Sequence, residues 1–241
     1  MEESFESTTL HFERLFQSYA SPILVLNLIK RVESVPRETV VGQVMDQAME
    51  YVQQQSFASG SISKRGPRLE YCTYDFLNAM KANEDVVDEV TNRVTPVHKE
   101  IGLFHFQGSS LDLNGVCPET GTSIVRPQTE QHGVIRVNCI DCLDRTNVAQ
   151  FCIGKLALRR QLHCLGVLQD QQNLEVECPQ LLSTFRDMFT EHGDRIVRYS
   201  CCKSVTLIES QSKWWRLRPI NMEAQEQCTK MHYKRKRNNQ L

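Results

Sequence analysis

Residues 136–147 read Arg-Val-Asn-Cys-Ile-Asp-Cys-Leu-Asp-Arg-Thr-Asn, and within this stretch five residues separate Cys139 from Arg145. A short apolar segment, 133–137, precedes it, and an amphipathic segment, 147–166, follows it. The pattern predicts a strand that ends in an anion-binding loop, followed by a helix whose N-terminus adds positive potential to that loop. Such a loop can curl around a phosphate dianion and bring the Arg145 guanidinium back beside the Cys139 sulfur.

The segments upstream and downstream predict an α/β fold. Pro22–Ile29 is a nearly continuous apolar run, which is typical of a strand buried on both faces of a parallel sheet. The other elements predicted from periodicity are strands at Leu69–Tyr74, Ile101–Phe106 and Gly133–Val137, helices at Val40–Gln55, Asp85–Lys99, Asn147–Gly166 and Pro179–His192, and loops at Gly60–Pro67 and Gln107–His132. This order favours an open, mostly parallel sheet flanked by helices, with a cysteine-phosphatase-like loop between strand and helix.

Composition and charge narrow the class of protein. The 241 residues are 40% hydrophobic and 24% charged, which suits one substantial globular domain. A net charge of −1 argues against a nucleic-acid-binding protein, whereas an anionic lipid head group needs only a local basic pocket. The longest apolar run is shorter than the ~20 residues of a membrane-spanning helix, and the start Met1-Glu2-Glu3 does not resemble a signal peptide. Membrane contact is therefore expected to be peripheral.

The ten cysteines are irregularly spaced, which predicts reduced thiols on the cytosolic side rather than a disulfide framework. Cys139 and Cys142 have the spacing of a zinc or dithiol motif. A zinc site would need a second pair at comparable spacing, and Cys201, Cys202 and Cys228 do not supply one. The histidines show no paired metal spacing either, so no metal site is predicted.

Cys139 is the predicted nucleophile of this loop. Attack of its thiolate on phosphorus would form a phosphocysteine, which water would hydrolyse. Backbone N–H groups, Arg145 and the helix N-terminus are expected to lower the pKa of Cys139. Arg145 is expected to bind the phosphate bidentately through the transition state. Cys142 is interpreted as a packing residue or as a disulfide partner of oxidised Cys139.

Residues 136–147 match, with two positions free, the R-x-N-C-x-D-C-L-D-R-T-N motif of the Sac-domain phosphoinositide phosphatases, and the chain resembles that family over roughly residues 9–199. The resemblance also rests on His11-Phe12-Glu13, Ser21–Lys30, Val148–Phe151 and Glu191–Asp194. Within the family, the chain is most similar to the endolysosomal polyphosphoinositide phosphatases that act on phosphatidylinositol 3,5-bisphosphate. Sac domains carry a β-rich N-terminal subdomain. We therefore expect residues 1–199 to be the catalytic part, with that subdomain absent, and residues 200–241 to be a divergent, disordered tail.

The resemblance implies roles for further residues of the motif. Asp141 is expected to protonate the leaving inositol oxygen, although a role in stabilising the loop remains open. The residues expected to shape the loop and bind substrate are Arg136, Asn138, Thr146 and Asn147. Asp75 and Asp194 match family positions only loosely and are interpreted as capping residues. The mechanism through Cys139 requires no cofactor, and the resemblance leaves room for stimulation by magnesium.

The function implied by the resemblance is removal of a ring phosphate, the 5-phosphate of phosphatidylinositol 3,5-bisphosphate, at the cytosolic face of endosomal, lysosomal or vacuolar membranes. The alternative is a catalytically weak scaffold protein in a complex with a lipid kinase and a helical-repeat scaffold. A protein-tyrosine or dual-specificity phosphatase is a third reading. Its loop usually carries glycines, whereas residues 140–144 are Ile-Asp-Cys-Leu-Asp.

Overall fold

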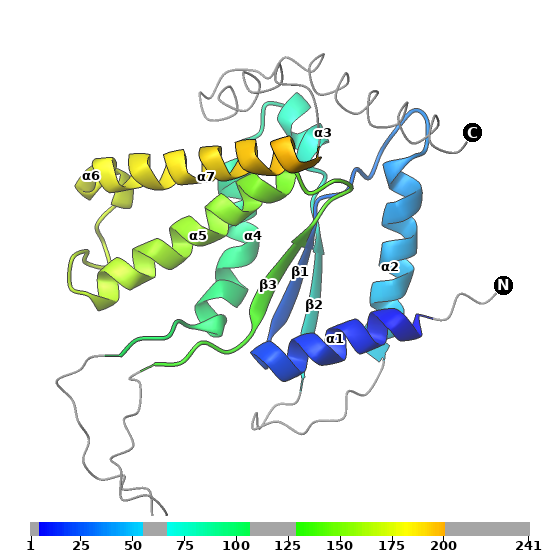
Figure 1. The fold of residues 1–241 in the computed structure, drawn as a ribbon, viewed down its shortest axis with the longest axis horizontal. Helices are drawn as coiled ribbons and strands as arrows, with labels where there is room; N and C mark the ends of the chain where they lie inside the picture. Colours follow the sequence, from blue (N-terminus) through cyan, green and yellow to red (C-terminus); the bar gives the residue numbers. More distant parts are fainter. Residues whose placement is uncertain (1–4, 55–66, 107–128, 201–241) are drawn as a thin grey trace, which may run out of the picture. The chain divides into compact units, whose positions relative to one another are not determined.

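The computed structural model describes residues 5–54, 67–106 and 129–200 (Figure 1). Its centre is a parallel sheet of three strands, β1 (Ile23–Asn27), β2 (Leu69–Thr73) and β3 (Val134–Asn138), in the order β2-β1-β3. Asn27 at the end of β1 pairs with Thr73 on one side and with Asn138 on the other. The three strands therefore end at the same edge of the sheet.

Seven helices surround or follow these strands in the described part of the chain. They are α1 (Glu6–Tyr19), α2 (Glu38–Gln54), α3 (Phe76–Lys81), α4 (Val86–Ile101), α5 (Arg145–Cys164), α6 (Leu174–Glu177) and α7 (Pro179–Ser200). The chain divides into two compact units, residues 1–172 and 173–241. The described part of the second unit contains α6 and α7, which contact each other. No described helix is both long enough and apolar enough to cross a membrane.

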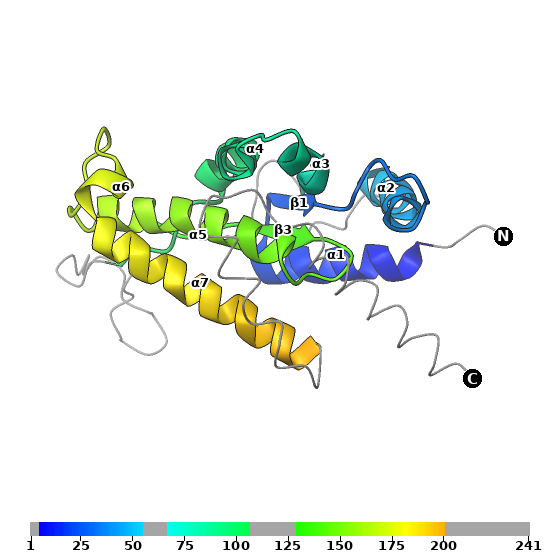
Figure 2. The same ribbon diagram turned by 90° about the horizontal axis from the view of Figure 1, so that it is seen from above.

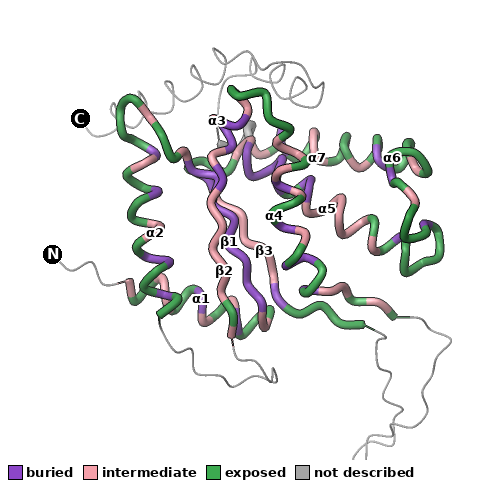
Figure 3. The backbone as a smooth tube through the Cα atoms, turned by 180° about the vertical axis from the view of Figure 1, so that it is seen from behind, coloured by how far each residue is buried: buried purple, intermediate pink, exposed green. Residues whose placement is uncertain are grey.

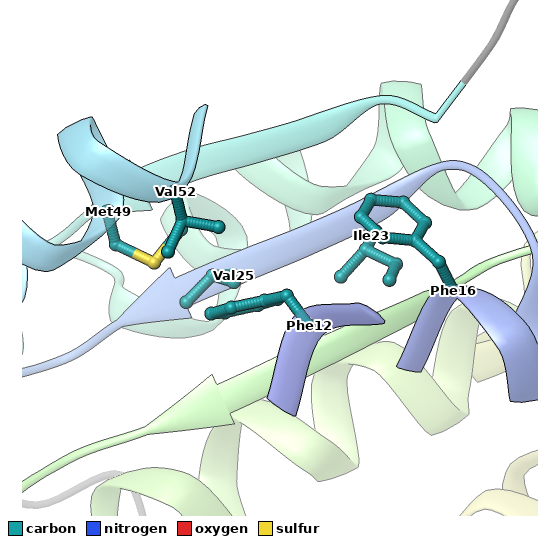
Figure 4. Packing of buried hydrophobic residues seen from close by; sticks show 6 residues of the cluster. All are labelled: Phe12, Phe16, Ile23, Val25, Met49 and Val52. Carbon is teal, nitrogen blue, oxygen red and sulfur yellow. The ribbon is translucent and has the colours of Figure 1, made fainter. Parts of the chain in front are cut away.

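The core forms on both faces of β1, whose residues are all buried (Figure 3). Alternate side chains of a strand point to opposite faces. On one face, Ile23 and Val25 pack with residues of α1 and α2, as Figure 4 shows: Phe12, Phe16, Met49 and Val52. Burying each such side chain stabilises the fold by about 1.5–3 kcal/mol. The confirmed α/β class thus follows from a strand that is apolar on both faces.

The helices that follow β1 and β3 lie on opposite sides of the sheet. The polypeptide runs from β1 to its neighbour β2 through α2, and then from β2 past β1 to β3 through α4. These two connections run in opposite directions along the sheet. Because both are right-handed crossovers, α2 and α4 lie on opposite faces (Figure 2). Helix α5, which follows β3, packs against α4. The loops after β1 and β3 therefore diverge. A crevice between diverging loops at the carboxyl edge of a parallel sheet is the usual place for a ligand.

Three predicted elements differ from the structure. Ile101–Phe106 is not a strand: α4 continues to Ile101, Gly102 ends it with φ of 77°, and His105 forms only an isolated antiparallel bridge with Thr129. Helix α5 begins at Arg145 instead of at the expected Asn147, so Thr146 and Asn147 both lie in its first turn. Helix α7 continues through Gly193, because a glycine inside a helix costs only about 1 kcal/mol relative to alanine.

Other predictions are confirmed or fall outside the described residues. The predicted strands at 22–29, 69–74 and 133–137 and the helices that follow the first two of them form close to their expected bounds. Helices α1, α3 and α6 were not predicted. Asp75 is a capping residue, as expected: its side chain accepts a hydrogen bond from the backbone N of Asn78 at the start of α3. Residues 60–66, 107–128 and 201–241, where loops and the tail were expected, are outside the described part of the chain.

Candidate functional site

Cys139 follows directly after β3, and the loop that it begins ends at the first turn of α5. The side chain is buried, with 8% of its surface exposed. Its sulfur accepts hydrogen bonds from the backbone N of Cys142, at 2.9 Å, and from the hydroxyl of Thr146, at 3.3 Å. The first N–H groups of a helix have no partner within the helix, so an anion is stabilised near them. The loop therefore places the sulfur where a thiolate or a phosphate is favoured.

The loop turns at Cys142, whose φ of 55° lies in the left-handed region. A residue other than glycine in this region costs of the order of 1–3 kcal/mol and is kept where the surroundings over-determine it, most often at functional sites. Here the turn directs the backbone N–H of Cys142 at the sulfur of Cys139. Asp141 supports the same turn, because its Oδ1 accepts a hydrogen bond from the backbone N of Leu143 at 3.3 Å and lies 3.4 Å from the Cys139 sulfur. Asp141 thus contacts the Cys139 sulfur and also stabilises the loop.

Arg145 is almost fully enclosed, with 3% of its surface exposed, and Glu38 is 7% exposed. Nη1 donates to Glu38 Oε2 at 2.7 Å and to the Leu28 carbonyl oxygen at 3.0 Å, and Nη2 donates to Glu38 Oε1 at 3.3 Å. Burial disfavours the charged guanidinium, but the hydrogen bonds to Glu38 and the acidic groups around the guanidinium raise the pKa of Arg145. The arginine that was expected to hold phosphate is therefore charged and fixed by a carboxylate.

Arg136 and Asn138 belong to a hydrogen-bonded chain across the ends of the strands. Arg136 Nη1 donates to Asn138 Oδ1 at 3.0 Å, and Asn138 Nδ2 donates to Asn27 Oδ1 at 2.8 Å. Two more hydrogen bonds extend this network: Asn27 Nδ2 donates to the Tyr71 hydroxyl oxygen at 2.7 Å, and that hydroxyl donates to Asp46 Oδ1, also at 2.7 Å. Burial first, and then the bond to Asp46, raises the pKa of Tyr71, so the hydroxyl keeps the proton that it donates. These contacts fix the end of β3 from which the loop departs.

The loop between β1 and α2 is fixed by carboxylates. Oδ2 of Asp75 accepts hydrogen bonds from the backbone N of Arg31, at 2.6 Å, and of Val32, at 3.3 Å. Lys30 Nζ lies 3.6 Å from Glu33 and 3.4 Å from Glu38. A basic side chain thus stands next to the Glu38–Arg145 pair.

The two cysteines of the loop share one negative charge. The hydrogen bond with Cys142, and then burial, raises the pKa of Cys139 against the opposing charge of Arg145. The hydrogen bond with Cys139 lowers the pKa of Cys142 to about 5. The expectation that the loop lowers the pKa of Cys139 is wrong for this arrangement, because the neighbouring sulfur competes for the same charge. Transfer of one proton from Cys139 to Cys142 would produce the nucleophilic thiolate.

The structure brings together most of the residues expected at the site. Asp141 and Thr146 each contact the Cys139 sulfur, and Arg145 acts on Cys139 through its charge. Arg136 and Asn138 lie at the base of the loop, and Asn147 is buried in the first turn of α5. The residues that sequence reasoning missed and that the structure places in contact with the expected site residues, directly or through the hydrogen-bonded network, are Glu38, Asn27, Tyr71 and Asp46. No local motif marks them. The described residues include no group of three or more His, Cys, Asp or Glu side chains that could hold a metal ion.

A sulfur at the N-terminus of a helix, beside a buried arginine and at the carboxyl edge of a parallel sheet, can attack an electrophilic phosphate that the helix and the arginine hold. Residues 1–81 match the SacI homology domain family. The chain contains part of a SacI homology domain and is homologous to the Sac-family phosphoinositide phosphatases.

Three relatives illustrate the homology. The chain is 35% identical over 193 residues to a polyphosphoinositide phosphatase of Schizosaccharomyces pombe, an alignment that covers 80% of this chain and 20% of the relative. It is 30% identical over 264 residues to the phosphatidylinositol-3-phosphatase SAC1 of Arabidopsis thaliana, an alignment that covers 88% of this chain and 28% of the relative. It is 28% identical over 197 residues to the phosphatidylinositide phosphatase SAC2 of Mus musculus, an alignment that covers 81% of this chain and 14% of the relative. The chain thus spans less than a third of the length of each of these relatives.

Proposed function

We propose that this chain carries the catalytic loop of a phosphoinositide phosphatase that removes one ring phosphate through a phosphocysteine intermediate. The observation that carries the proposal is the position of the Cys139 sulfur, which accepts hydrogen bonds from Cys142 N and Thr146 Oγ1 at the N-terminus of α5. The names of the homologues, which are polyphosphoinositide and phosphoinositide phosphatases, support the same reaction.

The proposed reaction has two steps. The Cys139 thiolate attacks phosphorus, an S–P bond forms, and the bond between phosphorus and the inositol oxygen breaks. Asp141, which lies 3.4 Å from the sulfur, gives a proton to the leaving oxygen. Asp141 then accepts a proton from water as the water oxygen attacks phosphorus, inorganic phosphate leaves, and the Cys139 thiolate is restored. Thr146 stabilises that thiolate as the leaving group of the second step.

The proposed substrate is phosphatidylinositol 3,5-bisphosphate, and the phosphate removed is the one at position 5. Support comes from the motif of residues 136–147 and from the relative of S. pombe, which is named a polyphosphoinositide phosphatase. The proposed location is the cytosolic face of endosomal, lysosomal or vacuolar membranes, with peripheral attachment. This substrate is embedded in a lipid surface, so the enzyme needs only to approach that surface.

A second candidate function is that of a catalytically weak scaffold component in a complex with a lipid kinase and a helical-repeat protein. Two observations favour it. Glu38 already occupies part of the Arg145 guanidinium, and the pKa of Cys139 is raised by Cys142 and by burial. Both features would lower turnover if they persisted when substrate was bound.

Phosphate release from a panel of phosphoinositides and a phosphotyrosine peptide tests the two candidates. We expect release from phosphatidylinositol 3,5-bisphosphate by the full chain, none from the peptide, and loss of release in Cys139→Ser. Cys164→Ser is the matched control, because Cys164 is an exposed thiol at the far end of α5. Full activity of Cys139→Ser would refute the covalent mechanism. Absence of release from every lipid would favour the scaffold function.

A further inference from the structure

Glu38 is one of the residues near the loop that no local motif indicates, and it contacts Arg145 directly. Both of its carboxylate oxygens accept hydrogen bonds from the Arg145 guanidinium, at 2.7 and 3.3 Å, and both residues are buried. Two charges in such an enclosed site are costly unless their geometry is good. The pair joins the start of α2 to the start of α5, which are 107 positions apart in the sequence.

The carboxylate of Glu38 is itself fixed from a second direction. Lys30 Nζ lies 3.4 Å from Oε1, and the backbone N of Lys30 donates to Oε2 at 3.4 Å. Oε2 of Glu33 holds the same segment, because it accepts hydrogen bonds from the backbone N of Arg37 and of Thr39. A swing of Glu38 away from Arg145 would break the contacts with Lys30 as well. Glu38 is therefore a rigid support for the guanidinium.

Among the described residues, the pairing leaves two N–H groups on one edge of the guanidinium without a bonded acceptor. Arginine has five N–H donors in a planar fork. Nη1 uses both of its hydrogens, on Leu28 O and Glu38 Oε2, and Nη2 uses one, on Glu38 Oε1. Within the described residues, no acceptor is bonded to Nε or to the second hydrogen of Nη2. Nε–H and that Nη2–H form the side edge of the fork, which matches two oxygens of a phosphate.

We propose that Glu38 is a positioning residue that holds the Arg145 guanidinium by its outer edge, so that the side edge binds two phosphate oxygens at the Cys139 loop. The identity of the phosphate ester as a phosphoinositide rests on the proposed function, but the role of Glu38 applies to any phosphate bound there. The opposite role, in which Glu38 withholds Arg145 from the phosphate, predicts the opposite responses to substitution of Glu38.

Two substitutions separate position from charge. Glu38→Asp keeps the negative charge but moves it back by about 1.5 Å, the length of one C–C bond. Any loss of phosphate binding in this variant is therefore due to the changed position of the carboxylate. Glu38→Gln keeps the shape and removes the charge. A purely electrostatic or withholding role predicts that Glu38→Gln strengthens phosphate binding and that Glu38→Asp changes little. Positioning predicts that both variants weaken it.

The measurement is protection of Cys139 from iodoacetamide by inorganic phosphate, read at this residue by site-resolved mass spectrometry of the full chain. A misplacement of about 1 Å can cost on the order of 100-fold. We expect the phosphate concentration for half-protection to rise at least about 10-fold in Glu38→Asp. The control is Glu100→Asp, which shortens an exposed carboxylate paired with Arg68, away from the loop; it should leave protection unchanged.

The coupling to Arg145 completes the test. In an Arg145→Ala background, Glu38→Asp should cause no further loss, because a positioning residue acts only through its partner. Unchanged protection in Glu38→Asp, stronger protection in Glu38→Gln, or failure of both variants to fold would overturn the proposal. If only Glu38→Gln fails to fold, the phosphate protection measured in Glu38→Asp decides whether the proposal stands. Phosphate protection without release from any phosphoinositide would refute the proposed function and leave this inference standing.

Discussion

Thr146 offers a quantitative test of how the loop controls the nucleophile. Its hydroxyl donates to the Cys139 sulfur at 3.3 Å, and this hydrogen bond lowers the pKa of Cys139 against the effects of Cys142 and burial. Thr146→Val removes the donor and keeps the shape. A hydrogen bond to a charged group contributes about 1.5–3 kcal/mol, and one pKa unit corresponds to about 1.4 kcal/mol. We therefore expect the pKa of Cys139 to rise in the variant, and the fraction of thiolate at a given pH to fall by roughly 10- to 100-fold.

The assay is the pH dependence of iodoacetamide alkylation at Cys139, because only the thiolate reacts. At a fixed pH below the pKa, the variant should react roughly 10- to 100-fold more slowly if the intrinsic reactivity of the thiolate is unchanged. Thr95→Val is a matched control: the Thr95 hydroxyl bonds to the Thr91 carbonyl within α4 and should not affect the sulfur. An unchanged alkylation profile in Thr146→Val would show that the hydroxyl does not stabilise the thiolate and would refute the reasoning.

Three further predictions follow from the contacts of the described residues. Arg145→Lys should lower phosphate release by on the order of 100-fold or more, since a point charge cannot replace the fork that contacts both Glu38 and phosphate; activity within a few fold of the wild type would contradict this. Phe12→Ala should lower the free energy of unfolding by about 3–5 kcal/mol in urea denaturation, because Phe12 is enclosed between α1, β1 and α2, whereas the exposed Phe104→Ala should change it by less than about 0.5 kcal/mol. Burial raises the pKa of Cys152 to about 12. The neutral thiol therefore contributes stability that is fully present below the unfolded pKa of about 8.5 and is lost as the pH rises toward 12. In Cys152→Ala, the free energy of unfolding should fall less steeply at alkaline pH, and a fall identical to that of the wild type would refute the assignment.

Local sequence patterns were sufficient for the elements whose burial is uniform or strongly periodic. Pro22–Ile29 is apolar at nearly every position, which only a strand covered on both faces requires, and β1 lies within it. The strand before Cys139 and the helix after Arg145 were predictable because residues 133–166 change from a short apolar run to helical spacing. The prediction of a strand at Ile101–Phe106 was wrong, because a short apolar run has no periodicity that distinguishes the end of a helix from a strand.

The sequence by itself determined the residues of the loop. Cys139, Asp141, Thr146 and Arg145 lie within seven positions of one another, so the geometry of one turn and one helix start brings them together. Only the tertiary structure decided what faces the arginine. Glu38 reaches Arg145 across 107 positions because α2 and α5 both begin at the carboxyl edge of the same sheet. Such a pair leaves no local pattern: its stability comes from burial and from the register of strands that are distant in the chain.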